Sequence, residues 1–426
     1  MQQSPKKSKT VFKPRIAFVI PWFSENISGG AEAEAKALIE HLKPYFEIEV
    51  LTTCVKDFLS CWNENFWKEG EYAEMGVKIR RFTVRERDTL AFDIVNAKLM
   101  NGRGGDYSKE GSANISQSEE ETYIAESVRS LSLNDYLEKN RDFYEWFLFI
   151  PYMFGTTYDG IKIVKEKAVL IACLHDESYA YLDIYKEMIG EARKVFLHVN
   201  AEKRLAERIF GASEKFVIVG EGVDFEGCDV ACNCGLAQKV GGSWKSMDGR
   251  KFSEKYGLKD FVLYAGRKDT TKNTPQLVEF FDRFVKETGS ELELVLIGPG
   301  EIPLPDNPQI KDLGFLDKEE KYAAMKEARF LCNPSLNESF SIVLMESWLC
   351  NKPVLVNGNC AVTKDHVLSA NGGLYYEDYY TFAECMKYLL EHREEAGMMA
   401  KNGKEYVLTN FTWDRVVQNY LKALND

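Results

Sequence analysis

Short apolar runs alternate along the chain with segments whose apolar residues recur every three or four positions. The first run, Arg15 to Pro21, is rich in β-branched residues, as are strands buried in a parallel sheet. The pair Gly29 and Gly30 follows, residues 31–42 have the spacing of an amphipathic helix, and residues 46–52 form a second apolar run. This order predicts a β-α-β unit of the Rossmann type, although the G-x-G-x-x-G pattern of dinucleotide-binding proteins is lacking.

Two stretches of different composition interrupt this alternation. Residues 85–145 are highly charged and contain a segment rich in Gly and Ser, which predicts a loop followed by helices, inserted into the first domain. Residues 227–251 are rich in Gly, Cys and Ser, which is typical of a linker. The other predicted strands are residues 168–173, 192–199, 216–219, 261–265, 292–297, 310–313, 329–332 and 353–356, and the predicted helices are 201–209, 275–288, 318–327, 341–350, 380–391, 394–409 and 413–424.

Two such series on either side of a linker predict an α/β protein with two Rossmann-like, doubly wound domains that face a central cleft. We assign the first domain to residues 1–235, the second to residues 236–410 and a final helix to residues 411–426. Ligands of such folds bind beyond the carboxyl ends of the parallel strands, so the loops that follow strands are the candidates for the site.

Charge and hydropathy limit the partners. The net charge of −12 argues against nucleic acid, and an anionic ligand would need a local cluster of cations. The longest apolar runs are far shorter than the ~20 residues that span a bilayer. Residues 1–15 are basic without an apolar stretch typical of a signal peptide. We expect a disordered terminus, and weak contact with an anionic membrane surface is the alternative.

The ten cysteines follow no regular spacing, which is typical of reduced thiols in the cytosol. We therefore expect a cytoplasmic protein, with the inner face of the membrane as the alternative. Cys228, Cys232 and Cys234 are close in sequence, but no fourth ligand with fitting spacing lies nearby. We expect three loop thiols without a metal, and a metal site is the alternative.

Two cations, Arg267 and Lys272, lie in the loop that follows the predicted strand 261–265. A guanidinium can donate to two phosphate oxygens at once, and a lysine adds a movable point charge. Cations in loops are usually only solvated, but the position after a strand favours a role in binding an anion.

Residues 333–346 combine a loop, a helix start and two carboxylates. The helix is expected to begin near Ser341, so Glu338 belongs to the loop and Glu346 to the second turn. The amides at 339–342 would then lack intrahelical partners and could hold a phosphate. A loop carboxylate can accept hydrogen bonds from a sugar, and one further down can bind the hydroxyls of a ribose. The alternative is an acid that complements the helix dipole and a surface glutamate.

The E-x7-E spacing of Glu338 and Glu346 resembles family 4 of the retaining glycosyltransferases (glycosyl transferases group 1), which have the GT-B fold. Six other motifs follow in the family's order and cover nearly the whole chain apart from residues 85–145 and the linker. They are Ser28-Gly29-Gly30-Ala31-Glu32, Leu174-His175-Asp176, Gly220-Glu221-Gly222-Val223-Asp224, Gly266-Arg267 to Lys272-Asn273, Leu296-Ile297-Gly298-Pro299-Gly300 and Lys352-Pro353-Val354-Leu355-Val356.

The resemblance implies that the first domain binds the acceptor, the second binds the donor, and the last helix crosses back onto the first domain. It also implies that Glu338 contacts the transferred sugar and that His175 donates hydrogen bonds near the anomeric carbon. Arg267 and Lys272 would bind the diphosphate, and these four are the candidate catalytic residues. The other implied donor-binding residues are Gly29, Gly30, Gly266, Asn273, Gly298, Ser339, Phe340, Ser341, Ile342 and, at the ribose, Glu346.

The chain departs from the family pattern beside Glu338. The family usually has Gly where this chain has Ser339 and Ser341. Both serines are small, so the amides can still donate, but the transferred sugar cannot be read from the motif.

The expected reaction moves a hexose from a nucleotide-sugar, such as UDP- or GDP-hexose, to a glycan or lipid-linked saccharide of a cell-surface polysaccharide. The resemblance implies retention by front-face attack, in which the leaving phosphate takes the acceptor's proton. The chain has no D-x-D triplet, which favours an enzyme without a metal or other cofactor. The alternatives are another GT-B enzyme, such as a sugar-nucleotide epimerase or a phosphorylase, and a non-catalytic nucleotide-sugar-binding protein.

Overall fold

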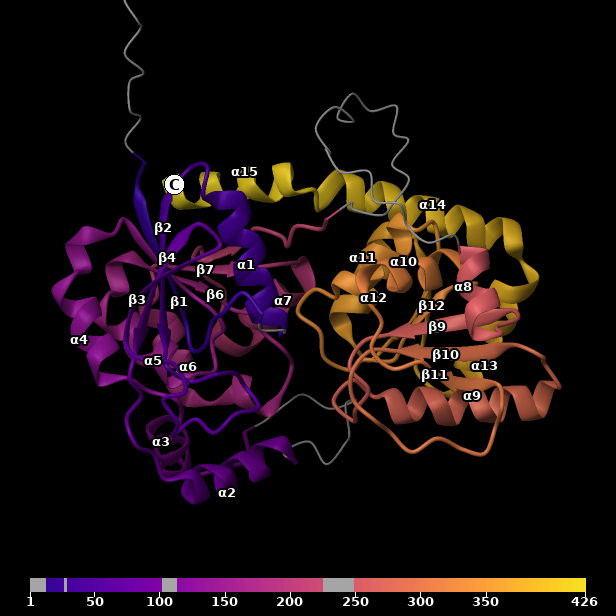
Figure 1. The fold of residues 1–426 in the computed structure, drawn as a ribbon, viewed down its shortest axis with the longest axis horizontal. Helices are drawn as coiled ribbons and strands as arrows, with labels where there is room; N and C mark the ends of the chain where they lie inside the picture. The colour runs from indigo at the N-terminus through magenta and orange to yellow at the C-terminus, as the bar shows by residue number, and fades with distance from the viewer. Residues whose placement is uncertain (1–12, 27–28, 102–112, 225–248) are drawn as a thin grey trace, which may run out of the picture.

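Two α/β domains follow one another along the chain, each built around its own sheet (Figure 1). The computed structural model describes residues 13–26, 29–101, 113–224 and 249–426. The first part of the basic terminus and the thiols Cys228, Cys232 and Cys234 lie outside the described residues.

The first sheet consists of β1 (Arg15–Ile20), β2 (Glu47–Thr53), β3 (Gly70–Glu74), β4 (Val77–Phe82), β5 (Trp146–Phe149), β6 (Ala168–Ile171), β7 (Lys194–Leu197) and β8 (Phe216–Ile218). Its strand order is β3-β4-β2-β1-β5-β6-β7-β8, and all neighbours are parallel except β3 and β4. The residues of β1 from Ile16 to Val19 are fully buried, because helices cover both faces of the sheet.

The second sheet consists of β9 (Phe261–Ala265), β10 (Glu293–Ile297), β11 (Ile310–Asp312), β12 (Leu331–Asn333), β13 (Val354–Asn357) and β14 (Gly373–Tyr376). Its order is β11-β10-β9-β12-β13-β14, and every pair is parallel. Each strand predicted in this domain is present, with bounds that differ by one or two residues. The predicted pair of doubly wound domains is therefore confirmed.

Fifteen α-helices lie in the described part of the chain. The first domain holds α1 (Gly30–Leu42), α2 (Thr89–Met100), α3 (Gln117–Ala125), α4 (Leu131–Lys139), α5 (Gly155–Ile163), α6 (Asp183–Glu191) and α7 (Asn200–Phe210), with 3-10 turns at Arg141–Phe143, Lys165–Lys167 and Ser178–Tyr181. The rest are α8 (Gly249–Tyr256), α9 (Thr274–Thr288), α10 (Lys318–Glu327), α11 (Ile342–Leu349), α12 (Ala361–Ala370), α13 (Tyr379–Glu391), α14 (Arg393–Asn410) and α15 (Trp413–Asn425). Residues 249–251, placed in the linker by composition, begin α8.

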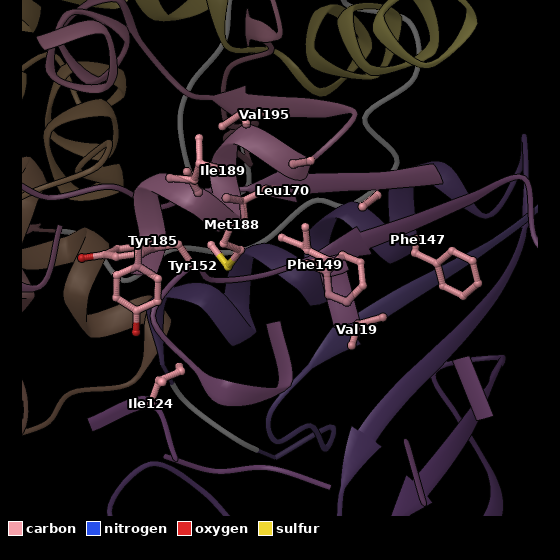
Figure 2. Packing of buried hydrophobic residues seen from close by; sticks show 14 of the residues in the cluster. Val19, Ile124, Phe147, Phe149, Tyr152, Leu170, Tyr185, Met188, Ile189 and Val195 are labelled. Atoms are coloured by element: carbon pink, nitrogen blue, oxygen red, sulfur yellow. The ribbon is translucent and has the colours of Figure 1, made fainter. Parts of the chain in front are cut away.

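The charged stretch 85–145 contributes to the core of the first domain. Phe92 of α2, Tyr123 of α3 and Leu137 of α4 are buried in one cluster with the residues of β5 and β6. Figure 2 shows part of this cluster, which includes Leu170 of β6 and Met188 of α6. Helix α2 precedes the segment rich in Gly and Ser, so the predicted order of loop and then helices is wrong for residues 89–100.

Helix α15 leaves the second domain and packs on the first (Figure 1). Val416, Tyr420 and Leu424 are buried in one cluster with Phe18 of β1 and Phe196 of β7. At its start, Trp413 stacks on the His41 ring at 4.0 Å and donates to Asp224 at 2.9 Å. The end of the chain thus forms part of the first domain's core.

None of the described helices combines the length and apolar composition that crossing a bilayer would require.

Candidate active site

The loop after β9 carries both predicted phosphate-binding cations and is held by hydrogen bonds to Asp269. Its carboxylate accepts from the Thr271 hydroxyl at 2.6 Å and from the Lys272 amide at 2.9 Å, and it pairs with the Arg267 guanidinium. Burial tends to raise the pKa of Asp269, but these donors hold it below its ordinary value. Asp269 therefore stays ionised and keeps Arg267, whose side chain is half exposed, in the loop.

Two glycines after β10 let that loop lie directly against the cationic loop. Gly298 and Gly300 have φ angles of 127° and 91°. A Cβ on Gly298 would lie 2.0 Å from the carbonyl oxygen of Gly266, and one on Gly300 would lie 2.5 Å from that of Lys268. Both positions therefore require glycine. The predicted donor-binding residues Gly266 and Gly298 are thus neighbours.

Helix α11 begins directly after Ser341, as the sequence predicted. Ser341 is its N-cap, in the left-handed region with φ 75° and ψ 70°, and its hydroxyl accepts from the Asn333 amide at 3.0 Å. The Phe340 side chain is buried against the rings of His366 and Phe411, with centroids 5.3 and 4.9 Å away. Phe340 anchors the turn through its side chain, so only its backbone is available to a ligand.

Lys272 and Glu338 meet although they lie in different loops. The Lys272 Nζ donates to Glu338 Oε1 at 2.8 Å, and the neighbouring Asn273 amide donates to the carbonyl oxygen of Pro334 at 3.2 Å. Burial tends to raise the pKa of Glu338, but Lys272, with smaller contributions from Ser335 and His175, holds it below its ordinary value. Glu338 is therefore a carboxylate paired with a lysine.

Glu346 faces a pocket of about 310 Å³ in the second domain. Its Oε1 accepts hydrogen bonds from Lys321 Nζ at 2.5 Å and from the Tyr322 hydroxyl at 3.1 Å. The other walls include Gly266, Gly298, Phe315, Leu316 and Ile342, so an apolar slot opens beside a fixed carboxylate.

A second pocket, also of about 310 Å³, lies between the domains. Glu338 lines it from the second domain, and Asp176, Arg204 and Arg208 line it from the first. Arg208 pairs with Asp176 at 2.6 Å, whereas Arg204 reaches Asp365 of α12 at 2.7 Å and so joins the two domains. Charged side chains of both domains thus surround Glu338.

The first-domain candidates lie in different places. His175 follows β6, and its side chain is 31% exposed with Nδ1 3.7 Å from Glu177 Oε1. Its charge makes a small contribution to the low pKa of Glu338, from the other domain. Gly29 is the N-cap of α1, where a Cβ would clash with the Glu32 carboxylate, and nothing lies within 4 Å of a Cβ on Gly30, the first residue of the helix. Neither glycine lines either pocket.

The second domain, which holds the two glutamates and two cations, also carries the similarity to a known family. Residues 248–406 match the family model of glycosyl transferases group 1. The predicted resemblance to a group 1 glycosyltransferase is confirmed by this match, for these residues.

Curated relatives of the group 1 glycosyltransferase region are distant. The chain is 24% identical over 184 residues to trehalose synthase of Thermococcus litoralis, which is 38% of this chain and 43% of the relative. It is 25% identical over 189 residues to glycosyltransferase 1 domain-containing protein 1 of Xenopus tropicalis, which is 40% of this chain and 53% of that protein. The chain thus matches only about half of the length of these relatives.

Solved structures cover the whole fold. The α,α-trehalose 6-phosphate synthase of Burkholderia multivorans has a TM-score of 0.67 at 11% identity, over 97% of this chain and 98% of that chain. HepE of Anabaena in complex with UDP-glucose has a TM-score of 0.65 at 13% identity, over 96% and 99%. Sucrose-phosphate synthase of Thermosynechococcus elongatus has a TM-score of 0.63 at 14% identity, over 96% and 98%. These likenesses confirm the predicted GT-B fold.

Several residues of the site were not predicted from the sequence. Lys321 and Tyr322 lie on α10 and reach Glu346 only because α10 packs beside α11. Arg204 and Arg208 are one turn apart on α7, so they share one face of that helix. That spacing, next to the predicted cleft, is the signal that could have indicated them.

Proposed function

We propose that this chain is a retaining glycosyltransferase that moves a hexose from a nucleoside diphosphate sugar to a glycan or lipid-linked saccharide, in the synthesis of a cell-surface polysaccharide. The proposal rests on one observation. The Glu346 pocket, the start of α11 and the Glu338 pocket follow one another, and we call these three features the row. The family match supports transfer of a sugar. The solved complex of a structural neighbour with UDP-glucose supports a nucleotide-sugar donor.

A donor of this class fits the row from end to end. The base and ribose would occupy the apolar pocket, where the Glu346 carboxylate, held by Lys321 and Tyr322, can accept hydrogen bonds from two ribose hydroxyls. The diphosphate would follow at the start of α11, where helix amides and the positive end of the dipole favour an anion. The hexose would then reach the pocket of Glu338 between the domains.

The Lys272–Glu338 pair suggests how the site changes when the donor binds. Lys272 lies 2.8 Å from Glu338 and also belongs to the proposed diphosphate site. As the bond to the sugar breaks, negative charge grows on the diphosphate, and Lys272 and Arg267 would stabilise it without a divalent ion there. Glu338 would then be free to accept hydrogen bonds from sugar hydroxyls.

Transfer with retention would proceed on the face of the sugar that the diphosphate leaves. The acceptor oxygen forms the new bond to the anomeric carbon while the bond to the phosphate oxygen breaks, and that phosphate oxygen takes the acceptor's proton. Glu338 orients the sugar in this scheme, and His175 of the first domain donates a hydrogen bond to the sugar rather than acting as a base.

The test begins with the donor. UDP-, GDP-, ADP- and dTDP-hexoses are screened by thermal shift, because a ligand at a hundredfold excess over Kd stabilises the folded chain by about 2.7 kcal/mol. With the donor that binds, Glu338→Gln and Lys272→Ala are expected to lower the rate of donor cleavage by about a hundredfold or more. Glu384→Gln and Lys286→Ala are the matched controls, since both side chains are exposed and pair only within their own helix.

The outcomes separate the alternatives. Equal rates for wild type and both site variants would refute the site, and no stabilisation by any nucleotide-sugar would refute the function. Interconversion of two nucleotide-sugars without an acceptor would indicate an epimerase, and binding without turnover would indicate a binding protein. The anomeric configuration of the product, measured by NMR, tests retention.

A further inference from the structure

A cluster of chemically distinct side chains lies under the cleft, in the first domain, and has no part in the proposed transfer. Glu34 comes from α1, Cys173 follows β6 and His198 follows β7. One ligand atom from each lies within 4.8 Å of the others. The His198 Nε2 is 2.7 Å from Glu34 Oε1, and the Cys173 Sγ is 3.4 Å from Glu34 Oε2. Carboxylate, thiolate and imidazole are the ligand types that Zn²⁺ prefers.

The second nitrogen of the imidazole faces a fixed carboxylate. The His198 Nδ1 lies 3.2 Å from Glu202 Oε2. Glu202 is itself held by backbone amides, those of Leu174 at 2.7 Å and His198 at 2.5 Å. Histidines that bind metals usually have such a carboxylate behind the ligating ring, because it fixes the orientation and tautomer of the imidazole. Glu202 lies at this position, although His198 Nδ1 makes no hydrogen bond to it in this structure.

The cluster also holds more buried negative charge than its protein partners neutralise. Glu34, Glu202 and Glu221 are all buried, and in the described part of the chain His198 is the only ion-pair partner of the first two. Burial raises the pKa of Glu221 above its ordinary value, and the charge of Glu34 adds to this shift. The buried Tyr420 hydroxyl has no hydrogen-bond partner among the described residues. The charges of Glu34 and Glu221 act on this hydroxyl and, with burial, raise its pKa.

We propose that Glu34, Cys173 and His198 bind one Zn²⁺ ion, with Glu202 as the carboxylate behind His198 and the fourth position left to water. Binding replaces the protons on the Cys173 thiol and on His198 Nε2, which are released to solvent. The partly exposed Cys173 gives the ion a way in. This site is separate from the proposed diphosphate site, so the proposal does not depend on the transfer reaction.

The ion would join α1 to the loops after β6 and β7. Cys173 has φ 50°, a left-handed conformation that costs about 1 kcal/mol or more for a residue with a Cβ. A metal bond to Sγ would hold this conformation and, with it, the following loop, in which His175 lies two residues further on. The proposed zinc would therefore position one wall of the cleft.

The experiment measures metal content and affinity on the full-length chain. After dialysis against a chelator, Zn²⁺ is titrated in competition with a chromophoric chelator, and bound zinc is counted by mass spectrometry. We expect one ion per chain. Cys173→Ser and His198→Gln should each weaken binding by more than about a hundredfold, and Glu202→Gln by about 10- to 100-fold. Cys61→Ser, which changes an exposed free thiol, is the control and should bind as wild type does.

Two further measurements keep the result unambiguous. With Co²⁺ in place of zinc, the thiolate-to-metal absorption band should be present in wild type and absent in Cys173→Ser. Circular dichroism of Cys173→Ser checks that this variant is folded. A variant with Cys228, Cys232 and Cys234 all changed to Ser should keep its zinc. If that triple variant loses the ion while Cys173→Ser retains it, or if wild type binds none, the proposal is overturned.

Discussion

His366 is an imidazole buried among aromatic rings, directly behind the turn that carries Glu338. Its ring contacts Phe340 at a centroid distance of 5.3 Å, and its Nδ1 lies 3.1 Å from the Tyr406 hydroxyl. Burial lowers the pKa of His366 from 6.5 to about 4, although the charge of Asp365 opposes this shift. The folded protein therefore holds a neutral imidazole where the unfolded chain would bind a proton.

This burial predicts a loss of stability in acid. Between pH 6.5 and pH 4 the unfolded chain takes up a proton at His366 that the folded chain does not, so the free energy of unfolding falls as the pH falls, by up to about 1.4 kcal/mol per pH unit. His366→Gln removes this contribution, and its curve of unfolding free energy against pH should be flatter over that range. Urea denaturation at a series of pH values measures both curves, and parallel curves would contradict the prediction.

The contact between Lys272 and Glu338 could not be predicted from the sequence, although both residues were. The E-x7-E spacing and the position after a strand indicate each residue separately. Their pairing depends on two loops from neighbouring strands β9 and β12 ending at the same edge of the sheet. Side-chain partners such as Ser335, which acts on Glu338, follow only from that geometry.

The turn into α11 combines backbone strain with a side-chain bond that offsets it. Ser341 adopts a left-handed conformation that costs about 1 kcal/mol for a residue with a Cβ. Its hydroxyl accepts a hydrogen bond from the buried Asn333 amide, and such a bond contributes about 1 kcal/mol. The serine that departs from the family pattern thus has a role in this chain that a glycine could not fill.

Two substitutions at Ser341 separate these contributions. Ser341→Gly relieves the strain and loses the hydrogen bond, so its stability should stay within about 1 kcal/mol of wild type. Ser341→Ala loses the same hydrogen bond but keeps the left-handed strain, so it should be less stable than Ser341→Gly by about 1 kcal/mol. Chemical denaturation compares the three proteins. An alanine variant as stable as the glycine variant would show that the left-handed conformation at this position costs nothing.

Most elements with an uninterrupted apolar run or a clear helical period were predicted, whereas β5 was missed although all four of its residues are apolar. Strand β9, and β1 after Arg15, are apolar because both faces of each sheet are covered. Helix α12 and strand β14 have no such pattern, since α12 mixes Thr, Lys, Asp and His with its apolar residues. The order of helices and loop in residues 85–145 failed for the same reason, because the Gly- and Ser-rich segment concealed α2 from the pattern.

The two domains are held together where α15 returns to the first one. Gly222 lies under Trp413 at this junction, and a Cβ on Gly222 would meet the indole ring at 2.3–2.6 Å. The stacking of Trp413 on His41 leaves the ring little room to move away. The motif that contains Gly222 was indicated by the family resemblance, but its contact with α15 is known only from the structure.

We therefore expect Gly222→Ala to lower the free energy of unfolding of the protein. The added methyl group forces the Trp413 ring or the backbone to shift, with an expected cost of about 1–3 kcal/mol. Gly190→Ala is the matched control, because it lies in α6 with nothing within 4 Å of the added Cβ, and alanine favours helix by about 1 kcal/mol. Thermal unfolding should show a lower Tm for the first variant only. A Tm equal to that of wild type would mean that the junction adapts at no cost.

The return of α15 has a consequence for the order in which this protein is made. The ribosome completes the strands of the first sheet before it begins the second domain, yet Val416, Tyr420 and Leu424 fill the face of that sheet only when synthesis reaches them. Until then the nascent first domain exposes Phe18 and its neighbours. A fragment that ends at residue 224 should therefore aggregate on expression, and addition of a synthetic peptide with the sequence of residues 411–426 should restore its solubility.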